Sequence, residues 1–211
     1  MYPAHWLPPH QKNLRPEGLS YSGPLTCNLC SYYIYTVMSR LRRIAVQDRI
    51  FFVTTNLATN VTSLSPKERD LLLTVLDALR SSCDFLVLGY VVMPDHAHLL
   101  VTCRTESIPK LMHQWKFKTG YTIQKGRGSH GPFWQARYFD FICRHSRDVS
   151  DKLTYIHNNP VEGGLCQHDD EWRWSSASYY ARTAAPPLIP DIVDFSGDSN
   201  ELLWPAPWRT L

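Results

Sequence analysis

The order of apolar segments between residues 49 and 180 constrains the fold more than any other feature of the sequence. The β-branched and aromatic stretch RIFFVTTN, at 49–56, predicts a strand. The next segment, SPKERDLLLTVLDALR, begins with a capping box of Ser65 and Glu68 and then repeats leucine and valine at helical spacing, so it predicts a helix. FLVLGYVV, at 85–92, predicts a second strand. The domain therefore begins as strand, helix, strand.

The remaining segments repeat that order and add one helix. A Met-Pro-Asp turn leads into a third strand at 97–103, a second helix follows at 108–124, and YFDFICR at 138–144 predicts a fourth strand. SRDVSDKLTYIHNN predicts a last helix, which we expect to stop before Pro160 because proline disfavours helical geometry in the preceding residue. The β-α-β-β-α-β order predicts an α+β fold, a ferredoxin-like antiparallel sheet with its helices on one face, extended by one C-terminal helix.

Proline marks the expected ends of this folded unit. Ten of the 15 prolines lie before residue 49 or after residue 181. Because clustered prolines are typical of irregular chain, we expect an irregular N-terminal extension at 1–48, one folded domain at 49–181 and a Pro-rich tail at 182–211.

Composition says more about the cellular location of the protein than about any reaction it catalyses. No apolar run approaches the roughly 18 residues that span a bilayer, and the N-terminus lacks the pattern of a secretory signal. The six cysteines are scattered in a way that suits a reducing compartment, so we expect a cytoplasmic protein. The net charge of +3 is too mild to establish a nucleic-acid partner by itself.

Two histidines stand inside the third predicted strand, in the run VVMPDHAHLLV. Side chains alternate along a strand, so His96 and His98 project from one face while Ala97 and Leu99 face the core. Two imidazoles on one face make half of a metal site. The spacing alone favours a plainer interpretation, in which the histidines are partly exposed and bonded to neighbours.

The last predicted helix carries a second pair of polar residues. Val149, Leu153 and Ile156 form a stripe that can pack on the sheet, and Tyr155 and Asn159 lie together on a neighbouring face, four residues apart. The same spacing is compatible with an ordinary helix in which Tyr155 is half-buried and Asn159 caps the end.

Three motifs in sequence, MPDHAHLLV, FWQARYFD and LTYIHNNPVEGGL, resemble the single-tyrosine HUH transposases, and above all their REP-associated tyrosine transposase branch. The resemblance covers about residues 49–178 and makes 49–181 an HUH transposase-like catalytic domain. It implies a single-strand DNA endonuclease and strand transferase that acts on hairpins through a 5′-phosphotyrosine. Tyr155 then matches the nucleophile, and Asn159 joins His96 and His98 as a metal ligand. Ala97 is smaller than the family's usual hydrophobe, and residues 1–48 have no counterpart.

The chemistry implied by the resemblance agrees with general principles. A tyrosine hydroxyl titrates near pH 10, so it needs a scissile phosphate that is held in line and polarised. A divalent ion polarises a phosphate oxygen as a Lewis acid. Imidazole with oxygen ligation suits Mg²⁺ or Mn²⁺, which are therefore the expected cofactors.

Basic residues predict where DNA binds. The second helix and its exit carry lysine and arginine interleaved with Trp115 and Tyr121, and cations grip phosphates while rings stack on unpaired bases. The alternative is an ordinary solvated helix with Trp115 in the core. The family resemblance adds an arginine before the fourth strand, and the last helix adds a lysine beside the tyrosine. The predicted DNA contacts are Lys116, Lys118, Arg127, Arg137 and Lys152.

Two other functions compete with this one. A metal-dependent hydrolase with its His-x-His pair at a barrel strand end is disfavoured, because the chain is shorter than the roughly 250 residues of a β/α barrel. A domesticated DNA-hairpin-binding protein that no longer cuts stays open. The sequence also leaves open the DNA target and the choice between a monomer and a homodimer.

Overall fold

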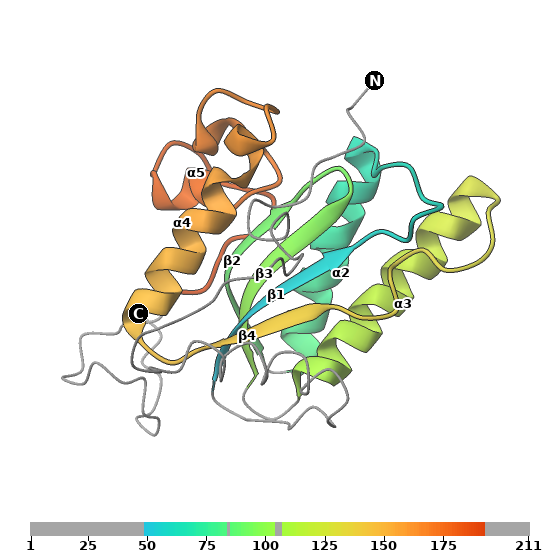
Figure 1. Cartoon of the computed structure of the whole chain (residues 1–211), viewed down its shortest axis with the longest axis horizontal. Helices are drawn as coiled ribbons and strands as arrows, with labels where there is room; N and C mark the ends of the chain where they lie inside the picture. The colour runs from blue at the N-terminus through green and yellow to red at the C-terminus, as the bar shows by residue number, and fades with distance from the viewer. Residues whose placement is uncertain (1–48, 84, 104–106, 193–211) are drawn as a thin grey trace, which may run out of the picture. The chain divides into compact units, whose positions relative to one another are not determined.

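The computed structural model describes residues 49–192 except 84 and 104–106, so the predicted extension at 1–48 and the end of the tail lie outside the described residues. Four strands form one sheet in the order β2-β3-β1-β4, and every neighbouring pair is antiparallel (Figure 1). This is the predicted ferredoxin-like arrangement. The strands are β1 (Ile50–Asn56), β2 (Phe85–Val92), β3 (His96–Cys103) and β4 (Phe139–Cys143).

Helices cover both faces of the sheet. α2 (Pro66–Cys83) and α3 (Ile108–Arg127) pack on one face, and the additional helix α4 (Ser146–Glu162) packs on the other (Figure 1). A short 3-10 helix (Asp169–Glu171) and α5 (Ala177–Tyr180) follow α4. None of the helices in the described part of the chain combines the length and hydropathy needed to cross a bilayer.

Strand alternation divides the core into two layers. On β3, Ala97 and Leu99 face the layer under α2 and α3, as predicted, whereas Leu100 faces α4. On β1, Val53 belongs to the first layer and Phe52 to the second. Two neighbouring positions on one strand therefore experience different surroundings, which is what separates the histidines from the main core.

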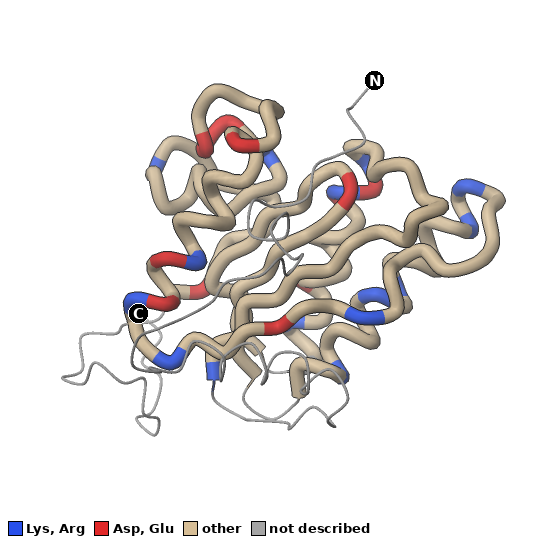
Figure 2. The backbone as a smooth tube through the Cα atoms, viewed as in Figure 1, with Lys and Arg blue, Asp and Glu red and all other residues tan. Residues whose placement is uncertain are grey.

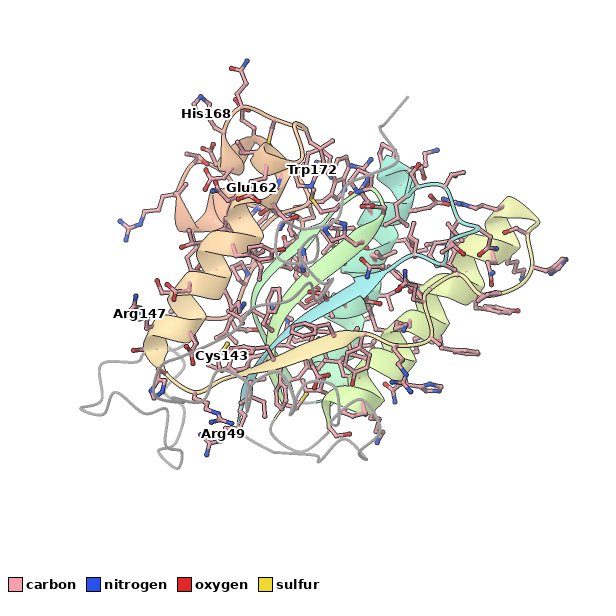
Figure 3. All side chains as sticks on the ribbon, in the orientation of Figure 1. Arg49, Cys143, Arg147, Glu162, His168 and Trp172 are labelled. Atoms are coloured by element: carbon pink, nitrogen blue, oxygen red, sulfur yellow. The ribbon has the colours of Figure 1, made fainter. Side chains whose placement is uncertain are left out.

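α4 continues two residues beyond Pro160, so the predicted stop before this proline is wrong. A proline ring removes one helical N–H, and here the loss falls in the last turn, where the buried ring gains packing. The Gly163 N–H closes the helix on the Asn159 carbonyl at 2.9 Å. Asn159 is thus an internal helical residue rather than a cap, and its side chain points to the sheet. Figure 3 labels Arg147 and Glu162 near the two ends of α4.

The described part of the predicted tail contacts the sheet. Leu188 is buried in the first core layer, and its carbonyl accepts the Tyr90 hydroxyl at 2.8 Å. Asp191 exchanges two hydrogen bonds with the Val87 backbone, of 2.7 and 2.8 Å. These contacts lie after residue 181; the domain boundary at that residue stays a prediction.

Candidate active site

The two histidines of β3 lie side by side beneath α4. His96 and His98 are 5% and 3% exposed, more buried than the plainer interpretation of the sequence required, and their ring centroids are 4.8 Å apart. Each Nδ1 atom has a partner: Asp95 Oδ1 at 2.7 Å for His96, and Thr54 Oγ1 at 2.8 Å for His98. Such bonds fix the orientation of an imidazole and leave its Nε2 atom for a ligand.

The Nε2 atoms face the side chain of Asn159. The distance from His96 Nε2 to Asn159 Oδ1 is 3.3 Å, and His98 Nε2 is buried without a hydrogen-bond partner among the described residues. Two ligands that each lie about 2.1 Å from one ion, at roughly 90–105°, are about 3.0–3.3 Å apart. The spacing and the buried, unpartnered nitrogen therefore fit a divalent ion.

The protonation of the site also fits metal binding. Burial lowers the pKa of His98 well below 6.5, repulsion from His96 and Lys152 lowers it further, and the Asn159 side chain partly opposes the change. A hydrogen bond with His96 keeps the pKa of Asp95 below its usual value despite partial burial. His98 is therefore a neutral imidazole at physiological pH, the form that binds metal ions.

The donor set is sparse. The described residues contain no grouping of three or more His, Cys, Asp or Glu side chains suited to a metal ion. The fully buried Asn159 places an amide oxygen beside His96, so it is a candidate for a third ligand. Mixed nitrogen and oxygen ligation with open positions suits Mg²⁺ or Mn²⁺ better than a closed zinc site.

α4 brings Tyr155 to the same place. Its ring centroid lies 5.3 Å from that of His98 and 5.8 Å from that of Phe52, both in edge-to-face geometry. The ring is half-buried, and its hydroxyl makes no hydrogen bond within the described residues. The Lys152 ammonium lies 4.8 Å from the Phe52 ring centroid and 5.9 Å from that of Tyr155. A hydroxyl, a cation and two imidazoles thus share one site.

The other predicted DNA contacts differ in their surroundings. Lys116 donates to the carbonyls of Gln135 and Ala136 at 2.6 and 3.3 Å, which ties α3 to the segment before β4. Lys118 and Arg137 are exposed. Of the predicted cations, Lys152 is the one whose ammonium is recorded near the Tyr155 ring, at 5.9 Å from its centroid.

Arg127 and Trp115 make contacts within the protein. Arg127 makes two bonds of 2.6 Å to Glu68, which also accepts from the Ser65 backbone in the capping box of α2. The prediction that Trp115 offers a ring to bases is wrong, because this side chain is fully buried and donates to the Leu72 carbonyl at 3.0 Å.

Sequence reasoning missed the residues that orient the histidines. Thr54 lies opposite His98 in the β1–β3 register, which no local pattern shows. Asp95 stands next to His96 in the quoted run, and we had taken it only as part of a turn. A carboxylate adjacent to a candidate ligand is a signal that could have been used.

The sequence has relatives among known proteins. A family model described as "Transposase IS200 like" matches residues 51–159, slightly more than half of the chain, and the match ends at Asn159. The chain belongs to the IS200-like transposase family. The matched segment runs from the second residue of β1 to Asn159 in the last turns of α4, so it contains all the residues of the site described above.

Curated relatives support the REP-associated tyrosine branch of the family, as the motifs predicted. The REP-associated tyrosine transposase of Escherichia coli K12 is 26% identical over 165 residues, which cover 78% of this chain and 94% of that one. A putative REP-associated tyrosine transposase of Haemophilus influenzae Rd is 26% identical over 113 residues, 47% of this chain and 64% of its own length.

A solved structure of a REP-associated tyrosine transposase bound to a REP hairpin has the same fold. It superposes with a TM-score of 0.59 at 24% identity, covering 75% of this chain and 96% of that one. At this level of identity the likeness concerns the fold, and it agrees with the four-stranded antiparallel sheet described above.

Proposed function

We propose that this protein is a transposase-like single-strand DNA endonuclease and strand transferase that acts on DNA hairpins, with Tyr155 as its nucleophile. One observation carries the proposal: Tyr155 packs against His98, and Asn159, one turn further along α4, contacts His96. Family membership and the similarity to REP-associated tyrosine transposases support hairpin DNA as the substrate. A REP-associated tyrosine transposase of the same fold was solved with a bound REP hairpin.

The reaction exchanges one phosphodiester bond for another. The Tyr155 oxygen attacks the phosphorus, its proton leaves to solvent, and the bond between phosphorus and the 3′ oxygen breaks. The leaving oxygen takes up a proton and becomes a free 3′-OH, while the 5′ phosphate stays on Tyr155. Because the phosphotyrosine link preserves the bond, a 3′-OH can reverse the step on another strand, which joins DNA without a further energy source.

His96, His98 and Asn159 would hold Mg²⁺ or Mn²⁺, and a bound ion supplies Lewis-acid polarisation of the scissile phosphate. Asp95 and Thr54 hold the two imidazoles in place through their Nδ1 atoms. These five side chains come from β1, the turn before β3, β3 and α4, so the sheet and the helix must both be in place before the site is complete.

Lys152 and Phe52 prepare the nucleophile. Phe52 stacks on His98 at 5.3 Å and meets the Tyr155 ring at its edge, which restricts the orientation of the tyrosine. The Lys152 ammonium lies over Phe52 and Phe141, where it is positioned to attract the phosphate that Tyr155 attacks.

The test is a covalent adduct. Protein is incubated with Mn²⁺ and a DNA hairpin that carries a single-stranded flank, and products are separated under denaturing conditions. Wild-type protein forms a denaturant-resistant adduct, whereas Tyr155→Phe forms none and binds the hairpin within a few-fold of wild type. Tyr138→Phe is the matched control and retains the adduct. Hairpin binding by wild type without any adduct favours the non-cutting DNA-hairpin binder, and an adduct in Tyr155→Phe assigns the nucleophile elsewhere.

The setting of the reaction follows from the same proposal. We expect the protein in the cytoplasm, where its DNA substrate lies, and the thiols of Cys143 and Cys166 agree with a reducing compartment. Figure 3 labels Cys143 where β4 leads to α4. We expect a monomer or a homodimer.

A further inference from the structure

The exposed side of α3 carries three rings in a row. His113, Phe117 and Tyr121 are spaced four residues apart and form what we call the ring ladder. Adjacent rings are nearly parallel, at 14° and 17°, with centroids 6.4 and 6.2 Å apart. Phe117 is 65% and Tyr121 61% exposed, so the ladder contributes little to the core of the protein. Large exposed aromatic groups that lie side by side are typical of a binding surface.

The charge on α3 indicates a polyanionic partner. The helix has 20 residues and contains no aspartate or glutamate, and the positions of its basic residues are coloured blue along the backbone in Figure 2. A surface that combines cations with flat exposed rings matches single-stranded nucleic acid, which offers both phosphates and unpaired bases. The basic residues of α3 are Lys110, Lys116, Lys118, Lys125 and Arg127.

The ladder forms one wall of a groove. The groove has a volume of about 440 Å³, and its opposite wall consists of the segment before β4, including Trp134, Gln135 and Tyr138. Lys116 bridges the two walls through its bonds to backbone carbonyls, with its ammonium 5.9 Å from the Tyr138 ring centroid. The groove therefore has aromatic sides and a cation, and Lys116 holds its walls in a fixed relation.

The groove is connected to the active site around the sheet edge. Tyr138 lines the groove, while the next residue, Phe139, is 45% exposed and meets Phe52 edge-on at 6.5 Å. Phe52 in turn stacks on His98 and contacts Tyr155. Because β4 is the edge strand, a flexible strand that leaves Tyr155 can pass around β4 and enter the groove.

We propose that the ring ladder is a stacking surface for the unpaired nucleotides that flank the hairpin, with Phe117 and Tyr121 supplying the ring faces. This inference rests on the proposed function for the identity of the DNA, and it adds a second binding surface to that function. The ring spacing of 6.2–6.4 Å is close to two steps of a stacked strand, about 6.8 Å at 3.4 Å per nucleotide. Duplex DNA cannot use the ladder, because its base faces are already stacked.

The test compares bases with phosphates. Binding of a fluorescent 20-nucleotide dT strand and of an abasic strand of the same length is measured without divalent ions. The double variant Phe117→Ala/Tyr121→Ala should bind the dT strand about tenfold or more weakly and the abasic strand as well as wild type does. Phe117→Trp/Tyr121→Trp should retain the affinity for dT. Thr122→Ala, exposed on the same helix, is the control for helix stability.

A leucine pair separates stacking from general hydrophobic contact. Phe117→Leu/Tyr121→Leu keeps apolar area and good helix propensity but has no ring face, so it should lose dT binding like the alanine pair. Equal binding of dT by wild type and the alanine variant overturns the proposal. So does retention of dT binding by the leucine pair, which would mean that general apolar contact, and not ring stacking, holds the strand.

Failure of this inference is distinguishable from failure of the proposed function. Binding to dT is measured in Tyr155→Phe protein as well, where no covalent step takes place. A ladder effect on dT binding, together with the absence of any adduct in wild-type protein, supports the ladder and contradicts the nuclease. Normal adduct formation with no ladder effect supports the nuclease and contradicts the ladder.

Discussion

The two faces of the sheet are built from the same strands but have different contents. Beneath α2 and α3 the buried positions of the strands are mainly apolar, as at Val53 and Leu99, with Thr55 as an exception. Beneath α4 one end of the face is apolar, and the other carries Thr54, His96 and His98. Burial of polar groups costs free energy unless partners offset it. The polar end therefore adds little to stability, and its retention under a helix is best explained by chemistry.

The largest expected effect contrasts neighbours on β3. Leu99→Ala should lower the free energy of unfolding by about 2–5 kcal/mol, because it opens a cavity in the apolar layer. His98→Ala, equally buried on the other face, should cost only about 1–2 kcal/mol, since the imidazole already carries a desolvation penalty. Urea unfolding without divalent ions measures both. Equal losses would mean that His98 is ordinary core packing.

Metal affinity should show the opposite ranking. His96→Ala and His98→Ala should each weaken Mn²⁺ binding by about 100-fold or more, or about 2.7 kcal/mol, because each removes a ligand nitrogen. Leu99→Ala protein that remains folded should bind Mn²⁺ like wild type. Titration calorimetry gives the affinities directly. Wild-type binding in either histidine variant would remove the metal site from this face.

How far the site could be predicted depends on whether its parts are local in sequence. The shared face of His96 and His98 followed from the period of a strand, and the shared face of Tyr155 and Asn159 from that of a helix. That α4 covers the histidines, and so buries them, depends on a helix some 50 residues away in sequence. The partner of His98 likewise required the β1–β3 register. No local pattern contains those contacts.

The order of strands and helices was predictable because it depends on local sequence patterns. The two errors in the prediction, at Trp115 and at Pro160, have physical causes. Strand and helix order followed from local apolar periods, which give the element type but not the face of α3 that is buried. Trp115 is buried in the core, where it donates a hydrogen bond to the Leu72 carbonyl of α2, whereas Phe117 and Tyr121 are exposed. The packing of α3 against α2 therefore decides which rings are buried. α4 passes Pro160 because tertiary packing outweighs the local preference of a single residue.

Residues that orient the ligands should have intermediate effects. Asp95→Asn and Thr54→Val should each weaken Mn²⁺ binding by about 10–100-fold, because the imidazoles lose their Nδ1 partners. Asn159→Ala should be no more severe, since water can replace a neutral amide oxygen. The same calorimetric titration checks all three variants. A loss in Asn159→Ala greater than that in His98→Ala would show that the amide, not the imidazoles, dominates the site.

The smallest effect concerns Arg127, outside both layers. Arg127→Ala should lower stability by about 1 kcal/mol or less, because the ion pair with Glu68 is partly exposed. Burial raises the pKa of the Glu68 carboxyl, but hydrogen bonds from Arg127 and Ser65 outweigh this and hold that pKa below 4.5. The pair therefore stabilises fully above about pH 4.5, and this is lost as pH falls through the lowered pKa. Urea unfolding at pH 7 and pH 3.5 should show the difference from wild type narrowing in acid.

Lys118→Ala is the counterpart of that variant on the same helix. Lys118 is exposed, so its loss should leave stability unchanged and weaken hairpin binding, with a shallower dependence on salt. Fluorescence titrations at two salt concentrations measure both variants. If Arg127→Ala weakens hairpin binding more than Lys118→Ala does, Arg127 contacts DNA as the sequence first indicated.

We expect Tyr155 to become linked to the 5′ phosphate of the downstream fragment, and end-labelled DNA tests this assignment most directly. A hairpin with a single-stranded flank is labelled at one end or the other, incubated with protein and Mn²⁺, and separated under denaturing conditions. The 3′-labelled strand should travel with the protein, peptide mapping should find the nucleotide on Tyr155, and the 5′-labelled strand should yield a short free product. Label from the 5′ end on the protein, or a nucleotide on a different tyrosine, would contradict it.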